Sequence, residues 1–192
     1  EIEPEVFSGC VELTEVLDKK KQIPIWKEIG DRTFYQCRKL QEICLEQIGR
    51  VGKEGLAGCS RLKIGKVKEG FLLKERAFEG TGFLQNKGNN CLSLGDIVIS
   101  GAGCVGEVYL PEEVTGIAPF AFSGNRNLTR LILPKGLKWI GEGAFFGCSA
   151  LTEVEFPERL VFIGERAFEK CSSLHFVHTG AEYIGKKAFA FC

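Results

Sequence analysis

The chain has 192 residues, which is enough for one well-buried domain and few for two. Its 25 Lys and Arg balance its 25 Asp and Glu, so no net charge draws it to nucleic acid or to an acidic membrane. Hydrophobic residues make up 44% and charged residues 26%, the balance of a soluble globular domain, and this excludes disorder. No apolar run approaches the ~20 residues of a membrane span, and no secretory h-region is present. Because the chain opens at Glu1 and contains no Met, we expect a trimmed piece of a longer array, and secretion stays open.

An internal repeat runs through the sequence. Residues 128–150, 151–173 and 174–192 align with a period of 23 that shrinks by two in the last copy. Upstream copies are weaker, and the expected repeat starts are Leu13, Leu40, Leu62, Leu84, Val105, Leu128, Leu151 and Leu174. Because a coil of this length cannot bury its own apolar face, the copies must stack. The sequence therefore predicts one domain over residues 1–192, built from about eight repeats of 21–27 residues.

Each part of the repeat predicts a local structure. Residues 151–156 alternate apolar and acidic side chains, which indicates a short strand with one buried face, and Pro157 ends it. Ile163-Gly164 then predicts a turn, and Ala167-Phe168 one helical or 3₁₀ turn that fills the space between coils. Cys171 follows three residues after the Phe.

The aromatic column of the repeat has one gap. Its members are Phe7, Phe34, Leu56, Phe78, Phe122, Phe145, Phe168 and Phe189. Between Phe78 and Phe122 the Ile-Gly-Ala-Phe pattern is absent over 44 residues, two periods. We expect a hairpin-like insertion near residues 86–104 that bulges from the array, with the glycines at 101–106 in its connection. Amide hydrogen exchange is expected to be faster around residues 86–92 than in the strand at 151–156.

The full pattern L-x-x-V-x-x-P-x-x-L-x-x-I-G-x-x-A-F-x-x-C resembles the BspA-type leucine-rich repeat. Residues 140–148 and 163–171 match it outright, and residues 96–117 resemble the insert that this family often carries. The first half departs from the pattern at Lys74 in place of Gly, at Leu56 in place of Phe, and at residues 18–22, which lengthen the first repeat. The resemblance implies an α/β fold: a right-handed βα superhelix, with short parallel strands on one side and short helical or 3₁₀ turns on the other. It also implies a place on bacterial or protozoan cell surfaces, adhesion or other protein binding, and no catalysis.

One motif points to a different function. Gly101, Gly103 and Gly106 have the G-x-G-x-x-G spacing of a dinucleotide site and follow a β-branched run. That site needs a helix directly afterwards, to point N–H groups at the pyrophosphate. The residues that follow alternate and are broken by Pro111, so the glycines are better interpreted as a tight connection between two short strands.

Candidate catalytic residues are few. The histidines are His175 and His178, three apart on one predicted strand, and a Cys–His dyad of Cys171 with His175 stays open. Cys171 recurs in phase with the repeat, which favours a structural role. The residues at 19–21 (three Lys) are interpreted as a solvated loop rather than a nucleic-acid patch. We therefore expect no enzyme, no cofactor and no nucleic-acid partner.

The nine cysteines cannot all pair within the chain, because their number is odd. Six recur at one place in the repeat, where Thr81 and Asn125 stand in two other coils: Cys10, Cys37, Cys59, Cys148, Cys171 and Cys192. A straight row of thiols does not make a tetrahedral metal site, so we expect no metal. Parallel stacking points the Cβ atoms one way, so we expect reduced, largely buried thiols.

The residues two and four after each strand's opening apolar position are expected on the open face of the sheet. They form two columns: Glu107, Arg130, Glu153 and Phe176, and beside them Tyr109, Ile132, Glu155 and His178. Exposed aromatic and apolar side chains with a charged surround mark interaction surfaces, although strands also carry them for cross-strand packing. The leading hypothesis is a cell-surface or secreted adhesion module that binds a protein, such as a host or matrix protein. The alternative is a structural spacer or intracellular scaffold segment, with nine unpaired cysteines favouring the cytoplasm; the oligomeric state stays open.

Overall fold

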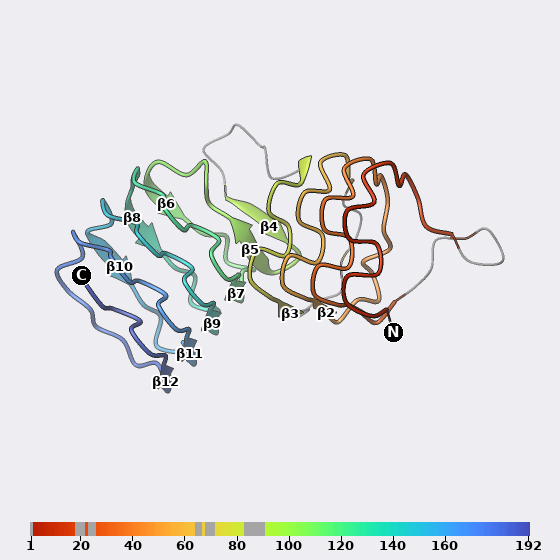
Figure 1. The fold of residues 1–192 in the computed structure, drawn as a ribbon. Helices are drawn as coiled ribbons and strands as arrows, with labels where there is room; N and C mark the ends of the chain where they lie inside the picture. The colour runs from red at the N-terminus through yellow and green to blue at the C-terminus, as the bar shows by residue number, and fades with distance from the viewer. Residues whose placement is uncertain (1, 18–21, 23–25, 64–66, 68–71, 83–90) are drawn as a thin grey trace. The chain divides into compact units, whose positions relative to one another are not determined.

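The computed structural model describes the chain except for residues 1, 18–21, 23–25, 64–66, 68–71 and 83–90 (Figure 1). It divides into two compact units, Glu1–Asn86 and Lys87–Cys192. Within each unit, short strands of successive coils pair in parallel, which is the arrangement of a β-solenoid. The right-handed winding, and a single domain over the whole chain, stay predictions.

Unit 1 carries one three-stranded parallel sheet. Its strands are β1 (Glu28–Ile29), β2 (Arg50–Val51) and β3 (Leu72–Leu73), in that order. The register aligns Ile29 with Val51 and Val51 with Leu73, and all three side chains are buried. The second residue of each strand therefore builds the core of the unit.

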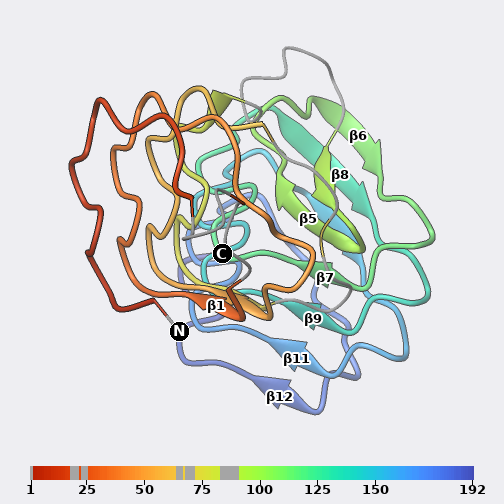
Figure 2. The same cartoon turned by 90° about the vertical axis from the view of Figure 1, so that its right-hand side faces the viewer.

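Unit 2 carries two sheets. Sheet C has the parallel order β10-β8-β6, from β6 (Gly106–Tyr109), β8 (Leu128–Ile132) and β10 (Glu153–Glu155). Sheet B has the order β12-β11-β9-β7-β5-β4. Its strands are β4 (Leu92–Leu94), β5 (Ile97–Ser100), β7 (Gly116–Ile117), β9 (Trp139–Ile140), β11 (Phe162–Ile163) and β12 (Tyr183–Ile184). Figure 2 shows β7, β9, β11 and β12 following one another on one side of the unit, apart from β6 and β8.

The Ile-Gly step corrects one sequence-based expectation. It was expected to be a turn, but Ile163 lies in β11 and pairs with Ile140 on one side and Ile184 on the other. The glycine is needed because the coils approach closely there. A Cβ on Gly164 would lie 2.6 Å from the backbone nitrogen of Glu142 and from the backbone carbon of Gly141. The step is thus a second strand position in each coil.

The expected helical turns are not confirmed, since no described residue lies in an α-helix. Three overlapping four-residue turns take their place: the N–H of Ala167 donates to Gly164 O, that of Glu169 to Arg166 O, and that of Cys171 to Phe168 O. The N–H groups that alternate with these, those of Arg166, Phe168 and Lys170, donate to carbonyls one coil further on. Alternate amides therefore bond across coils, which a helix does not allow.

The third residue has a positive φ in the turn at 164–167 (the first turn), in the turn at 168–171 (the second turn) and in their counterparts in seven other coils; this is a feature of type II turns, and it breaks any helix. In the first turn of successive coils these residues are Glu5, Arg32, Glu54, Arg76, Phe120, Gly143, Arg166 and Lys187. In the second turn they are Gly9, Gln36, Gly58, Gly80, Gly124, Gly147, Lys170 and Phe191. Glycine recurs in the second turn because it adopts this conformation without steric cost.

The phenylalanine column forms the core, as expected. In unit 2, Phe145 stacks between Phe122 and Phe168 with ring centroids 4.8 Å apart on both sides, and all three side chains are fully buried. In unit 1, Phe7 stacks on Phe34 at 5.2 Å. Leu56 and Phe78 take the same place in the next two coils and are also buried.

The recurring cysteines bond between coils. Each Sγ donates to the carbonyl of the Phe-position residue one coil earlier, at 3.0–3.2 Å: Cys37 to Phe7, Cys59 to Phe34, Cys148 to Phe122, Cys171 to Phe145 and Cys192 to Phe168. Thr81 instead donates to Phe78 of its own coil. The recurring cysteines of the inner coils are buried, as expected, but Cys10 and Cys192, in the outermost coils of their units, are exposed.

The coil between Phe78 and Phe122 keeps part of the repeat's hydrogen bonding but lacks its aromatic residue and its first turn, because β5 runs on to Ser100. The N–H of Gly101 donates to Ala121 O as that of Phe122 donates to Ala144 O, so Gly101 takes the Phe position. The ring of Phe122 occupies the space where a side chain at position 101 would lie, since a Cβ on Gly101 would be 1.9 Å from that ring. Cys104 takes the Cys position, because its N–H donates to Gly101 O.

A hairpin lies within the range of the expected insertion, part of which, residues 83–90, is outside the described residues. Strands β4 and β5 pair antiparallel, and β5 also pairs in parallel with β7. The hairpin therefore belongs to sheet B, and a bulge of the segment from the array stays a prediction. Gly101 and Gly103 lie in the connection from β5 to β6, and Gly106 begins β6.

Candidate functional site

The two predicted columns align on three strands of sheet C. Glu107, Arg130 and Glu153 stand opposite one another in register, and so do Tyr109, Ile132 and Glu155. Between the columns Val108, Leu131 and Val154 point into the core and are buried. The period-2 pattern thus places both columns on the outer face of the sheet.

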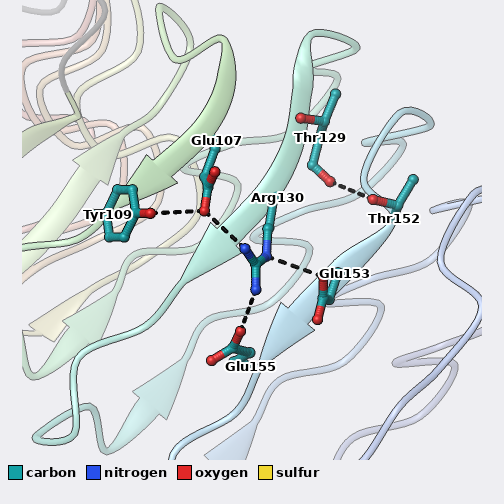
Figure 3. A network of polar contacts seen from close by, with 7 residues as sticks. All are labelled: Glu107, Tyr109, Thr129, Arg130, Thr152, Glu153 and Glu155. Atoms are coloured by element: carbon teal, nitrogen blue, oxygen red, sulfur yellow. Dashed lines mark hydrogen bonds and ion pairs between the residues drawn. The ribbon is translucent and has the colours of Figure 1, made fainter.

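Arg130 is the centre of a charge network on this face (Figure 3). Its guanidinium lies 3.1 Å from Glu107, 3.1 Å from Glu153 and 2.6 Å from Glu155. The nearby carboxylates, Glu153 first, raise the pKa of Arg130 above its ordinary value. Three carboxylates around one guanidinium leave the cluster with a net negative charge. Its side chains are about half exposed, so the network orients groups more than it stabilises the fold.

Tyr109 is tied into the network. Its hydroxyl donates a hydrogen bond to Glu107 Oε1 at 2.9 Å (Figure 3). This hydrogen bond raises the pKa of Tyr109 above its ordinary value. The side chain is nevertheless 69% exposed. Ile132 lies directly opposite on β8 and is half-buried. A fixed, exposed aromatic ring beside an aliphatic side chain is suited to packing against a partner.

The fourth member of each predicted column, Phe176 or His178, is not part of sheet C. Phe176 and His178 lie outside any strand, and Phe176 is 85% exposed. Leu174 to Ile184 is two residues shorter than Leu151 to Ile163. Since β12 keeps its pairing with β11, the shortened segment loses its register with β10. The predicted columns therefore end at Glu153 and Glu155.

An aromatic row on sheet B is a feature that the sequence analysis missed. Trp139, Phe162 and Tyr183 stand in register, and the rings of Phe162 and Tyr183 stack with centroids 5.0 Å apart. Phe162 is 38% exposed and Tyr183 55%. Trp139 extends the row over Gly116, where a Cβ would lie 2.1 Å from the indole. The signal was an aromatic residue before Ile-Gly in three consecutive repeats.

The residues considered for catalysis are not brought together as a site. The Sγ of Cys171 is buried and donates to Phe145 O, whereas His175 is exposed. The G-x-G-x-x-G glycines lead into strand β6 rather than into a helix. Within the described part of the chain, no three metal-ligating side chains form a group that could hold an ion. A helix able to cross a membrane is likewise lacking there.

Comparisons with known proteins follow the repeat. A sequence profile described as "BspA type Leucine rich repeat region" matches in six copies, over residues 1–97 and 89–192. Leucine-rich repeat folds are typically non-catalytic. No curated protein is similar enough to this chain to count as a match.

Solved structures give further similarities. A leucine-rich cell surface protein from Faecalibacterium prausnitzii is 23% identical, with a TM-score of 0.40; the match covers 81% of this chain and 37% of that one. A leucine-rich repeat protein from Bacteroides ovatus is 25% identical, with a TM-score of 0.44, over 90% of this chain and 56% of that one. A leucine-rich repeat protein from T. pallidum is 24% identical, with a TM-score of 0.44; the match covers 77% of this chain and 71% of that one. The match thus spans 37% of the length of the Faecalibacterium prausnitzii protein and 56% of the length of the Bacteroides ovatus protein.

Proposed function

Because the chain belongs to the BspA-type leucine-rich repeat family, we propose that it is a non-catalytic module that binds a protein through the outer face of sheet C. The observation that supports this most is Tyr109, which is 69% exposed yet held by a hydrogen bond to Glu107. A side chain that is already ordered loses little entropy when a partner packs on it. Aromatic anchors with a polar surround are typical of binding hot spots.

The partner is a protein with an apolar contact for Tyr109 and Ile132 and with basic groups around it. The reason for basic groups is the excess of acidic side chains around Arg130, where Glu107, Glu153 and Glu155 meet one guanidinium. Placement at the cell surface or in secretions is part of the same proposal, with a host or matrix protein as the partner.

A binding series tests the proposal. The full chain is immobilised and host extracellular-matrix proteins are passed over it, and the affinity of any binder is compared between variants. Changing Tyr109 and Ile132 together to Ser is expected to weaken binding by about tenfold or more, the loss of one hot spot. The matched control is Tyr183→Ser on sheet B, since Tyr183 is similarly exposed at 55%.

The outcomes separate the alternatives. Unchanged affinity in a folded Tyr109 and Ile132 double variant, with loss in Tyr183→Ser, moves the site to the aromatic row of sheet B. A spacer or scaffold segment is the second candidate, because Arg130 already neutralises part of the face within the chain. That candidate predicts no saturable binding to any protein tested and no effect of either variant.

A further inference from the structure

Two cysteines meet where the hairpin joins the coils of unit 2. Cys91 directly precedes β4, and Cys104 lies in the connection between β5 and β6. Their Sγ atoms are 2.8 Å apart. A disulfide has an S–S distance of about 2.05 Å, so the two sulfurs need to move together by only about 0.8 Å.

The backbone on both sides of this contact is fixed. The N–H of Cys104 donates to Gly101 O at 3.0 Å, and the side chain of Asn125 donates to Cys104 O at 2.8 Å. On the other side, Leu92 pairs with Ser100 in the hairpin. The two thiols are therefore held together by the fold rather than by chance contact of flexible ends.

The pair differs from the cysteines that recur along the coils. Cys148 and Cys171 stack in parallel, and each Sγ donates to a backbone carbonyl one coil earlier. Cys91 instead directly precedes β4 of the antiparallel hairpin, and its Sγ lies 2.8 Å from that of Cys104. Because Leu92 pairs with Ser100, β4 begins where β5 ends, and the two cysteines come together from different segments rather than from one column of stacked coils.

We propose that Cys91 and Cys104 are a reversible disulfide site that staples the β4–β5 hairpin to the start of β6. The oxidant is another disulfide, such as glutathione disulfide or a protein thiol oxidant. The Cys91 thiolate attacks it and displaces one thiolate, which gives a mixed disulfide. The Cys104 thiolate then attacks Cys91 Sγ and displaces the second thiolate. Each displaced thiolate takes a proton from solvent, and two electrons pass from the cysteine pair to the oxidant.

Exposure, rather than acidity, sets this order of steps. Cys91 is partly exposed, whereas Cys104 is 1% exposed, so an external disulfide reaches Cys91 first. In the reduced pair the Cys91 S–H stabilises a thiolate on Cys104, which lowers the pKa of Cys104, and the same hydrogen bond together with burial raises the pKa of Cys91. Once Cys91 is in the mixed disulfide it has no S–H to donate, so Cys104 loses its proton to solvent before it attacks Cys91 Sγ.

Thiol counting after equilibration tests the proposal. The full chain is held in buffers of increasing oxidised-to-reduced glutathione, quenched in acid, unfolded and alkylated, and its intact mass is measured. Seven of the nine cysteines are expected to be alkylated on the oxidising side. Digestion with trypsin and an Asp-specific protease then gives residues 88–95 joined to residues 96–126, because cleavage before Asp96 separates the two cysteines. Nine alkylated thiols at every ratio, or bonds among the recurring cysteines instead, would overturn the proposal.

Two controls keep the result specific. Cys91→Ser is expected to leave all eight remaining thiols free, and Cys44→Ser, a change at a similarly half-buried cysteine of unit 1, is expected to keep the crosslink. The equilibrium constant for closing the 91–104 bond should be at least about tenfold higher in the folded chain than in denaturant. Equal constants in both states would show that the fold does not preorganise the pair, and would overturn the proposal as well.

Discussion

Removing one ring from the phenylalanine column of unit 2 is expected to be strongly destabilising. Phe145 is fully buried and stacks on two rings, with centroids 4.8 Å from those of both Phe122 and Phe168. Phe→Ala in a core costs about 3–5 kcal/mol, and each aromatic pair adds about 0.5–1.5 kcal/mol beyond area burial. We therefore expect Phe145→Ala to lower the free energy of unfolding by about 4–5 kcal/mol, the upper end of that range.

A leucine at the same position is the informative comparison. Leu56 occupies the Phe position of a coil in unit 1 and is fully buried, so the coil accepts this side chain. Phe145→Leu keeps most of the apolar volume and loses both ring pairs. The expected cost is about 1–3 kcal/mol, the sum of two aromatic pairs.

Urea unfolding followed by tryptophan fluorescence measures both variants. Trp139 lies in unit 2 and Trp26 in unit 1, so a Trp26→Phe background reports on unit 2 alone. The control is Phe7→Ala, which removes a half-buried ring that stacks on Phe34 in unit 1 and is therefore measured through Trp26 in a Trp139→Phe background. The reasoning is wrong if Phe145→Ala costs less than about 1.5 kcal/mol, well below the usual range for a buried Phe, or no more than Phe145→Leu.

Three further outcomes follow from the turns, the inter-coil bonds and the thiols. Gly147→Ala is expected to cost about 1 kcal/mol in thermal unfolding and Gly180→Ala nothing: both have open space for a Cβ, but only Gly147 has a positive φ, of 70°. Asn125→Ala is expected to cost about 2–3 kcal/mol and Asn125→Cys less, because the side chain donates to two buried carbonyls and a thiol restores one bond; equal costs would contradict this. Burial raises the pKa of Cys59 from 9.0 to about 12, so its neutral form is favoured in the folded state. The contribution of the neutral thiol to folding stability is complete below pH 9 and is lost as the pH rises toward 12. Native Cys59 should therefore resist alkylation by iodoacetamide at pH 9, as measured by peptide mapping. Rapid alkylation at that pH would contradict this prediction.

The sequence predicted those features that depend on register alone. Once the period is known, Glu107, Arg130 and Glu153 must stand opposite one another, and so must the rings of Phe122, Phe145 and Phe168. The family assignment rests on the same regularity and is confirmed.

Other features depend on bonds that leave no mark in the side-chain pattern. The turns contain no helix because alternate N–H groups bond to the next coil, which is a property of the backbone. Gly101 has no apolar side chain that would mark it in the sequence as the Phe position of its coil. Only the hydrogen bond from its N–H to Ala121 O identifies that position. The close contact of Cys91 with Cys104 depends on the pairing of β4 with β5, which the repeat does not encode.

The most direct test of the proposed binding face is site-specific photo-cross-linking. The photoreactive residue p-benzoylphenylalanine replaces Tyr109 in one variant and Tyr183 in another, since both side chains are exposed aromatics in unit 2. Each folded variant is irradiated with a protein that binds the unmodified chain saturably, and the cross-linked peptide is mapped by mass spectrometry. The proposal predicts a cross-link from position 109 and little from position 183. A cross-link from position 183 alone, or from neither position while binding is retained, would contradict it.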